Sequence, residues 1–167
     1  EIVLVSDVTE YVTVTQKEGI NILIDGKNYQ FDGTIYIEGN SRHTGAETLT
    51  IQNVNFYTEK TSHDFISSNI ANQYTHNVTV KDCNFATSET NENNTVVGLR
   101  LRQAYDIAVE NCTSNHIFSL MWSAAVDGLA LNNVTVENCK EGITISGASK
   151  DVTIEDYVIT SPSFGIR

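Results

Sequence analysis

Five residues near the middle of the chain have side chains suited to chemistry on a charged ligand. Arg100 and Arg102 alternate in the segment "GLRLR", so in an extended strand both side chains project from the same face. Two guanidinium groups at that spacing suit the carboxylates of an acidic sugar chain, or else neighbouring acidic side chains. His63, Asp64 and His116 are candidates for proton transfer beside them. The alternative for these three is an ordinary exposed role.

The composition limits the partners that such a site could have. The chain has 10 basic and 21 acidic residues and a formal net charge of −11. Nucleic acids and anionic membranes are bound mainly through Lys and Arg, so neither is an expected partner. No run of about 20 apolar residues is present, so membrane insertion is not expected either.

The elements that must position these residues follow from a repeat. Seven segments have the form apolar-x-apolar: "VLVSD", "ILIDG", "LTIQN", "VTVKD", "IAVEN", "LALNN" and "VTIED". Their fifth residues are Asp7, Gly26, Asn53, Asp82, Asn111, Asn133 and Asp156. Asn, Asp and Gly together make up only 36 of the 167 residues, so composition does not explain seven matches out of seven.

Asn, Asp and Gly share a tolerance for the left-handed backbone conformation. Each repeat is therefore predicted to turn a sharp corner at its fifth residue. The corners follow one another at intervals of 19 to 29 residues, which favours about seven coils of a solenoid interrupted by loops of variable length.

Further alternating segments follow the corners, among them "GTIYIEG", "DFISS", "GLRLR", "SLMWS" and "GITIS". Period-two alternation with many β-branched residues predicts strands, which would stack as parallel sheets. The side chains expected to point inward are Leu99, Leu101, Leu120, Trp122, Ile143 and Ile145. Those expected on the outer face, where they could contact a ligand, are Arg100, Arg102, Met121, Thr144 and Ser146.

This order of strand, Asn or Asp corner, short second strand, variable loop and third strand resembles the right-handed parallel β-helix of the pectin-lyase-like superfamily. The resemblance covers essentially the whole chain and implies an all-β fold whose corner residues stack in a ladder of side-chain hydrogen bonds. The right-handed sense also agrees with the rule for parallel crossovers. We expect a single β-helix domain over residues 1–167, as a segment of a longer protein.

The resemblance also implies where chemistry would lie, on the outer face of the third strands and its flanking loops. The pectate lyase motif "RxPxxR" and the polygalacturonase set "NTD", "DD", "GHG" and "RIK" are absent, and "ILIDG" has Gly where the lyase pattern has His. The loop "ATSETNENNTVV" (86–97) is the longest insertion beside this face. Loops on a rigid scaffold often carry recognition, although a solvated loop has the same composition.

No metal or other cofactor is expected. Calcium would suit the many carboxylates, but no dense run of them supplies the six to eight oxygens of a site. Cys83, Cys112 and Cys139 lack the paired spacing of zinc ligands. Cys83 and Cys112 each follow a corner residue, which predicts inward-facing neighbours in adjacent coils, as thiols or as a disulfide.

Two functions remain open. The first is a β-helical surface, spike or adhesin-like module of a secreted, cell-surface or phage-tail protein, which binds a polysaccharide or surface glycan or simply supplies length. The second is a polysaccharide lyase or glycoside hydrolase fragment acting on an acidic polysaccharide. In either case we expect the ends of the solenoid to be covered by further coils, another domain or an oligomer, because unpaired strand edges invite aggregation.

Overall fold

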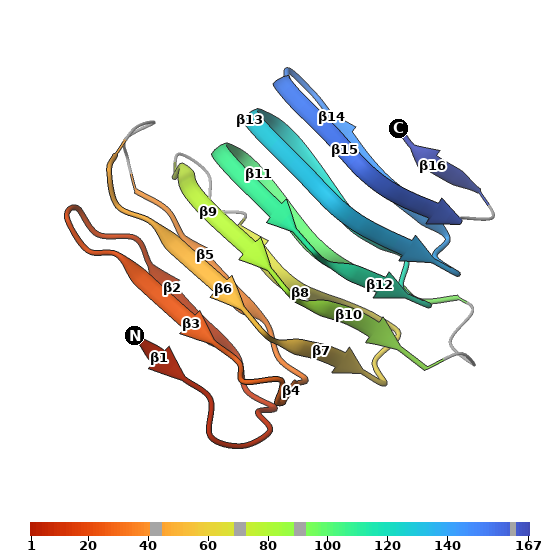
Figure 1. Ribbon diagram of the computed structural model, residues 1–167, viewed down its shortest axis with the longest axis horizontal. Coiled ribbons are helices and arrows are strands. Elements are labelled where there is room, and N and C mark those ends of the chain that lie inside the picture. The colour runs from red at the N-terminus through yellow and green to blue at the C-terminus, as the bar shows by residue number, and fades with distance from the viewer. Residues whose placement is uncertain (41–44, 69–72, 89–92, 161–162) are drawn as a thin grey trace.

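The computed structural model describes residues 1–40, 45–68, 73–88, 93–160 and 163–167. In these residues it contains sixteen β-strands and no helix. All pairings between the named strands are parallel. Successive coils stack along one axis from β1 (Ile2–Val3) to β16 (Phe164–Ile166), as Figure 1 shows. The predicted parallel β-helix is confirmed.

Each coil contributes to three sheets, which we name by the order of strands in the repeat. The first-strand sheet contains β1, β3 (Ile22–Asp25), β6 (Leu49–Gln52), β9 (Thr75–Lys81), the later parts of β11 (Thr95–Glu110) and β13 (Ser119–Glu137), and β15 (Lys150–Thr160). The second-strand sheet contains β4 (Gln30–Phe31), β7 (Asn55–Thr58), β10 (Asn84–Thr87), β12 (Thr113–Asn115) and the end of β13. The third-strand sheet contains β2 (Val12–Thr15), β5 (Ile35–Glu38), β8 (Ser62–Ser68), the beginnings of β11 and β13, β14 (Glu141–Ser146) and β16.

The core consists of columns in which equivalent residues of successive coils stack. One column of the first-strand sheet pairs Ile24, Ile51, Val80, Val109 and Leu131, all with at most 4% of their surface exposed. Alternation places every second residue of each strand inside, so each β-branched or leucine side chain contacts its counterpart above and below. Burial of such columns is the main favourable term in the stability of the solenoid.

An aromatic column fills the second-strand side of the core. Phe31, Phe56 and Phe85 stack in three consecutive coils, with ring centroids 5.6 Å apart for the first pair and 4.8 Å for the second. Phe65 of β8 packs against Phe56 at 5.4 Å and so joins the second and third strands of the same layer. These contacts fix the spacing between the two sheets.

The corner residues after the first strands stack as a second kind of column. Asn53, Asp82, Asn111, Asn133 and Asp156 all take the left-handed conformation, with φ between 48° and 53°. Asn133 Nδ2 donates to Asn111 Oδ1 at 2.9 Å, and Asn111 Nδ2 donates to Asp82 Oδ1 at 3.1 Å. The side chains therefore connect adjacent coils outside the backbone ladder.

The first two coils differ from the expected corner pattern. Gly26 does not take the left-handed conformation, which lies instead at Lys27 and Asn28. A Cβ at Gly26 would lie 2.7 Å from Val54 Cγ2, so Gly is required there for close packing. Asp25 instead forms the side-chain hydrogen bond to the next coil, since Asn53 Nδ2 donates to Asp25 Oδ1 at 3.0 Å.

In the first coil, Asp7 is not among the left-handed residues, and its carboxylate accepts a hydrogen bond from the Gln30 N–H at 2.9 Å. It therefore also connects two coils, but through the backbone of the next coil rather than through a second corner side chain.

A second set of corners lies between the third and first strands, and the repeat pattern did not reveal it. Asn77, Asp106, Gly128 and Asp151 occupy equivalent positions in four coils and all have positive φ. They were missed because β11 and β13 run through this corner without interruption, so the sequence has no loop to mark it.

All three cysteines are buried free thiols. Cys112 donates to Glu110 O and Cys83 to Lys81 O, both at 3.2 Å. The neighbouring Cys112 thiol and burial raise the pKa of Cys83, and burial raises the pKa of Cys139. These two thiols are therefore protonated at neutral pH and poorly reactive.

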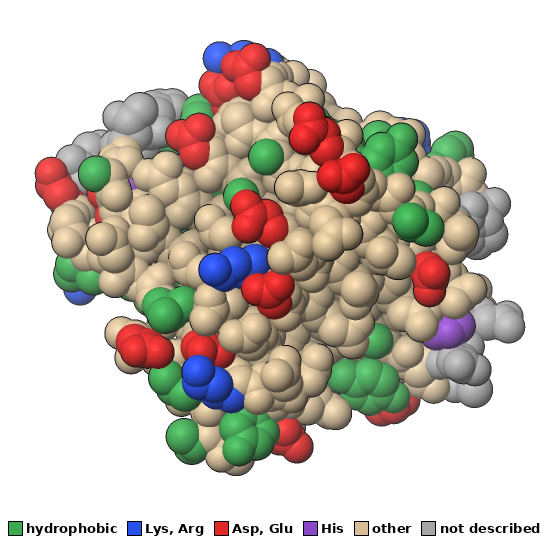
Figure 2. All heavy atoms as spheres, in the orientation of Figure 1, with side chains coloured by type: hydrophobic (Ala, Val, Ile, Leu, Met, Phe, Trp, Pro, Cys, Tyr) green, Lys and Arg blue, Asp and Glu red, His purple; other side chains and the backbone are tan. Residues whose placement is uncertain are grey.

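Figure 2 shows the molecule from the side of the first-strand sheet, where carboxylates and a smaller number of Lys or Arg side chains are scattered among uncharged ones. The outer positions of this sheet include Thr50, Thr79, Ala108 and Ala130, which form one register column, and Lys81 and Glu110, which pair in another. This face therefore combines small side chains with scattered charges of both signs.

Two substitutions at Asn111 separate the side-chain ladder from backbone strain. Asn111→Gly keeps the left-handed conformation but removes both side-chain hydrogen bonds, and it should lower the free energy of unfolding by about 1–2 kcal/mol. Asn111→Ala should cost about 1 kcal/mol more because Ala is strained at positive φ. Urea unfolding of the two variants measures the contribution of the side-chain hydrogen bonds and that of backbone strain. Equal losses of unfolding free energy in the two variants would show that the corner imposes no strain.

The corner at Asp25, in the second coil, should make stability depend on pH. Hydrogen bonds from the side chains of Lys27 and Asn53 hold the pKa of Asp25 well below its usual range. A lowered folded-state pKa means that the stabilisation is fully present above about pH 4 and is lost as the pH falls below that value. Asp25→Asn should be less stable than the wild type at pH 7 and should lose less stability between pH 5 and pH 2 in urea titrations. Parallel pH profiles for the two proteins would contradict this.

Candidate functional site

The outer face of the third-strand sheet carries a straight column of residues across five coils. The strand register pairs Tyr36 with Ser67, Ser67 with Arg100, Arg100 with Trp122, and Trp122 with Thr144. Because side chains alternate along a strand, all five start from the same face of the sheet. We call this set the outer column.

Trp122 belongs to this outer column, so its predicted inward orientation is wrong. Its neighbour Met121 pairs with Leu99 and Ile143 and is fully buried, so the prediction that Met121 faces a ligand is also wrong. The segment "SLMWS" has apolar side chains at both alternating positions, and its own pattern therefore does not define a face. Pairing with the leucines of β11 decides the register.

The remaining predictions for these strands are placed as follows. Leu99, Leu101, Leu120 and Ile143 are buried, and Ile145 is half-buried against the core. Arg102 and Ser146 are exposed, and Arg100 is half-buried. Thr144 is only 7% exposed, and its hydroxyl donates to Glu141 Oε2 at 3.0 Å, so little of its surface can contact a ligand.

The two arginines converge on Trp122 rather than standing apart. The Cζ atoms of Arg100 and Arg102 lie 5.0 Å and 5.5 Å from the centre of the indole ring, within the range of a cation–π interaction. Arg100 also donates its Nε–H to both carboxylate oxygens of Asp64, at 2.9 Å and 2.8 Å. Asp64 therefore neutralises and orients Arg100, whereas Arg102 extends into solvent.

A cavity of about 310 Å³ adjoins Trp122 on the side toward the next coils. Trp122, Thr144, Ser146, Glu141 and Arg167 contribute to its lining. Both arginines of β11 come from the preceding coil and do not line this cavity. The cavity combines an aromatic surface with hydroxyl, carboxylate and guanidinium groups.

The structure does not bring the three candidates for proton transfer into one reactive cluster. His63 Nε2 lies 2.9 Å from Gly33 O, which requires that this nitrogen carries the proton, and its ring packs against Phe65. Asp64 is held by Arg100. His116 has a φ of 58° and occupies a corner equivalent to Asn138 in the next coil, so its position serves the turn.

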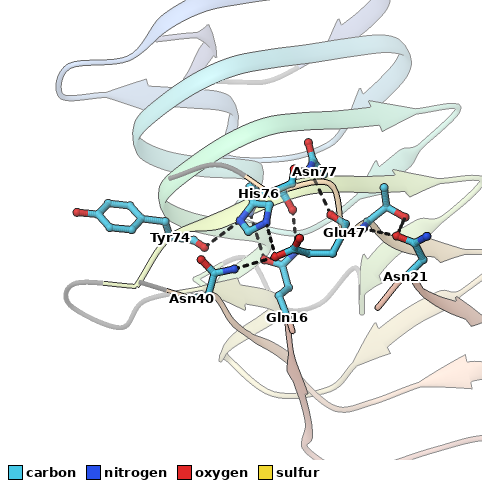
Figure 3. A network of polar contacts seen from close by, with 9 residues as sticks. Gln16, Asn21, Asn40, Glu47, Tyr74, His76 and Asn77 are labelled. Atoms are coloured by element: carbon cyan, nitrogen blue, oxygen red, sulfur yellow. Dashed lines mark hydrogen bonds and ion pairs between the residues drawn. The ribbon is translucent and has the colours of Figure 1, made fainter. Parts of the chain in front are cut away.

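A buried polar network lies beside the end of β5, and no pattern in the sequence predicted it. Gln16, Glu47 and His76 are exposed by only 4%, 2% and 1%. Figure 3 shows Gln16 reaching from one coil to His76, which belongs to β9. Gln16 Nε2 donates to His76 O at 2.6 Å, and His76 N donates to Gln16 Oε1 at 3.2 Å.

This amide takes the place of a strand partner. Among the described residues of the intervening coil, β6 pairs with β9 only from Val78 onward, and Gln16 forms hydrogen bonds with both the N–H and the C=O of His76. Glu47 Oε1 lies 3.2 Å from His76 Nε2 and accepts a hydrogen bond from Asn40 Nδ2 at 3.0 Å. The network therefore connects Gln16, Asn40 and Glu47 with β9.

The structure describes only part of the loop predicted to flank this face. In the loop 86–97, residues 89–92 lie outside the described residues; Ala86 and Thr87 end β10 and Thr95 begins β11. Among the described residues no group of three or more His, Cys, Asp or Glu side chains could hold a metal ion. The same residues contain no helix that could span a membrane.

Comparison with known proteins supports the architecture. A family model described as rhamnogalacturonase A/epimerase, pectate lyase-like matches residues 1–167. The chain belongs to this pectate lyase-like family. No curated protein and no solved structure matches it. Membership of this pectate lyase-like family implies that the β-helix is right-handed. It also confirms the superfamily that we predicted from the corner pattern.

The anchoring role of Gln16 can be tested without touching the outer column. Gln16→Met keeps the length of the side chain but leaves the backbone N–H and C=O of His76 unpaired in the interior. We expect the free energy of unfolding to fall by about 2–4 kcal/mol. Gln30→Met, at an exposed position, is the control and should change it by less than about 0.5 kcal/mol. Urea unfolding compares the two, and similar stabilities would refute the anchoring role.

Proposed function

We propose that this chain is a β-helical module that binds acidic polysaccharides through the outer face of its third-strand sheet. The proposal rests mainly on the distribution of the arginines. The sequence has four, and three of them, Arg100, Arg102 and Arg167, lie around Trp122 and its cavity. In a chain with 21 acidic residues, such a concentration of guanidinium groups on one face favours an anionic ligand.

Trp122 supplies the other half of a sugar site. An indole presents a large flat apolar surface, against which the C–H face of a pyranose ring can pack. Arg102 is exposed and can bind a carboxylate with two parallel hydrogen bonds. Asp64 engages Arg100 through its Nε, and the guanidinium lies beside the indole. A uronic acid ring on Trp122 would therefore find both an aromatic surface and charged donors.

An enzymatic function is the second candidate, and the family assignment is the observation that favours it, because its description names a rhamnogalacturonase, an epimerase and a pectate lyase. Such an enzyme would act on the same polysaccharide at the same face. His63 and His116 serve the fold as described above, and Asp64 is committed to Arg100. Binding without cleavage is therefore the function that the geometry supports better.

We further propose that the module is displayed outside the cell, on a secreted, cell-surface or phage-tail protein. Polysaccharides and surface glycans are found there, and a rigid stack of coils suits the display of a binding face. An adhesin-like or spike role fits both features.

Trp122 is the only tryptophan of the chain, so fluorescence excited selectively at tryptophan reports on the candidate site. Polygalacturonate should change the Trp122 emission in a saturable way, whereas a neutral glucan should change it little. Arg102→Gln should weaken binding about tenfold, because a charge-assisted pair contributes roughly 1.5 kcal/mol. Arg102 is preferable to Arg100 as a probe because its loss leaves no carboxylate without its ion-pair partner.

Lys81→Gln is the matched control, since it removes one positive charge from the outer face of the first-strand sheet. Its affinity for polygalacturonate should equal that of the wild type. An equal loss of affinity in both variants would show that only the net charge of the protein matters, and it would contradict a binding site at Trp122. New chain ends in the same samples would favour the enzymatic candidate, and an unchanged Trp122 emission with every polysaccharide would refute glycan binding at this face.

A further inference from the structure

A second aromatic surface lies on the same sheet, away from Trp122. Tyr11 and Tyr36 stack on each other with ring centroids 5.8 Å apart and an interplanar angle of 25°. Tyr11 is 61% exposed, and Tyr36 is half-buried beside it. Both side chains start from the outer face, because the intervening positions Val12 and Ile35 pair with each other toward the core. An exposed stacked pair of this kind has no role in the core columns.

The outer column connects the two aromatic surfaces. From Tyr36 it passes over Ser67 and Arg100 to Trp122, which is three strand steps, or about 14 Å at the usual spacing of neighbouring strands. Ser67 has a small side chain and is 7% exposed, so the residue next to Tyr36 does not project above the sheet. The path between the two surfaces therefore starts at a small side chain and continues over the half-buried Arg100.

We propose that Tyr11 and Tyr36 form a second sugar-binding platform, and that the ligand is a chain that runs along the helix axis from this platform to Trp122. This inference rests on the proposed function and adds a length requirement to it. Each pyranose ring lengthens a sugar chain by about the distance between two neighbouring strands. Three strand steps therefore correspond to three ring-to-ring steps, so roughly four consecutive rings are needed to reach both platforms. Shorter ligands can occupy only one of them.

Glu38 provides an independent probe of this path. It lies two residues after Tyr36 on β5, on the same face, and its Oε2 accepts a hydrogen bond from Thr15 Oγ1 at 2.7 Å. A carboxylate fixed beside the tyrosines repels an acidic chain that passes over them. Removing its charge should therefore strengthen the binding of a long acidic ligand, a gain that damage to the fold would not produce.

The experiment compares oligogalacturonides of two and six rings by isothermal titration calorimetry. The six-ring ligand should bind at least tenfold more tightly than the two-ring ligand. Tyr11→Ala should lower the affinity for the six-ring ligand about fivefold, as expected for the loss of one stacking contact. It should leave the affinity for the two-ring ligand unchanged. Glu38→Gln should strengthen the six-ring ligand about threefold.

Glu110→Gln removes the same charge from the outer face of the first-strand sheet and should change neither affinity. Equal affinities for both ligand lengths, together with unchanged binding in Tyr11→Ala and Glu38→Gln, would overturn the second platform while leaving glycan binding at Trp122 intact. Absence of binding for both ligands would instead refute the proposed function itself. If the Tyr11→Ala protein did not fold, Glu38→Gln would decide. Equal affinities of the Glu38→Gln and Glu110→Gln variants for the six-ring ligand would also overturn the second platform.

Discussion

The parallel in-register stacking of the coils is the constraint on which the rest of this structure depends. Each strand obtains its backbone hydrogen bonds from the coils before and after it, so every side chain stands next to its counterpart in the neighbouring coils. The aliphatic columns, the Phe31, Phe56 and Phe85 stack and the outer column are all consequences of this one register. A shift by one residue would exchange the inner and outer faces of a strand.

The corners must place each strand in the register set by the neighbouring coils. Left-handed residues bend the chain from one sheet into the next without a loop, and Asn and Asp add hydrogen bonds between coils that the backbone does not supply. Where a strand residue has no neighbouring strand on one side among the described residues, another group can supply its hydrogen bonds. Gln16 does this for His76 with a side-chain amide, and the buried Glu47 beside it shows that the replacement requires further polar partners in the interior.

The same stacking creates the candidate binding face. Because equivalent residues align, a few substitutions in successive coils suffice to build an extended surface, and here Tyr36, Arg100 and Trp122 fall on one line. Asp64 then converts Arg100 from a mobile cation into a fixed one held against the indole. The scaffold supplies rigidity, and the site needs only a small number of side chains that do not serve the core.

The sequence by itself determined the β-helix, because the corner pattern repeats seven times and apolar residues alternate along most of the predicted strands. It also placed Arg100 and Arg102 on one face. Only the tertiary structure decided that Trp122 lies outside and Met121 inside, because both are large and apolar and their own segment does not distinguish them. The contact between Gln16 and His76 could not be predicted from the sequence either, since it joins residues 60 positions apart. Local patterns specify which residues form a strand, whereas the neighbouring strands fix its register and with it the side chains that reach the surface.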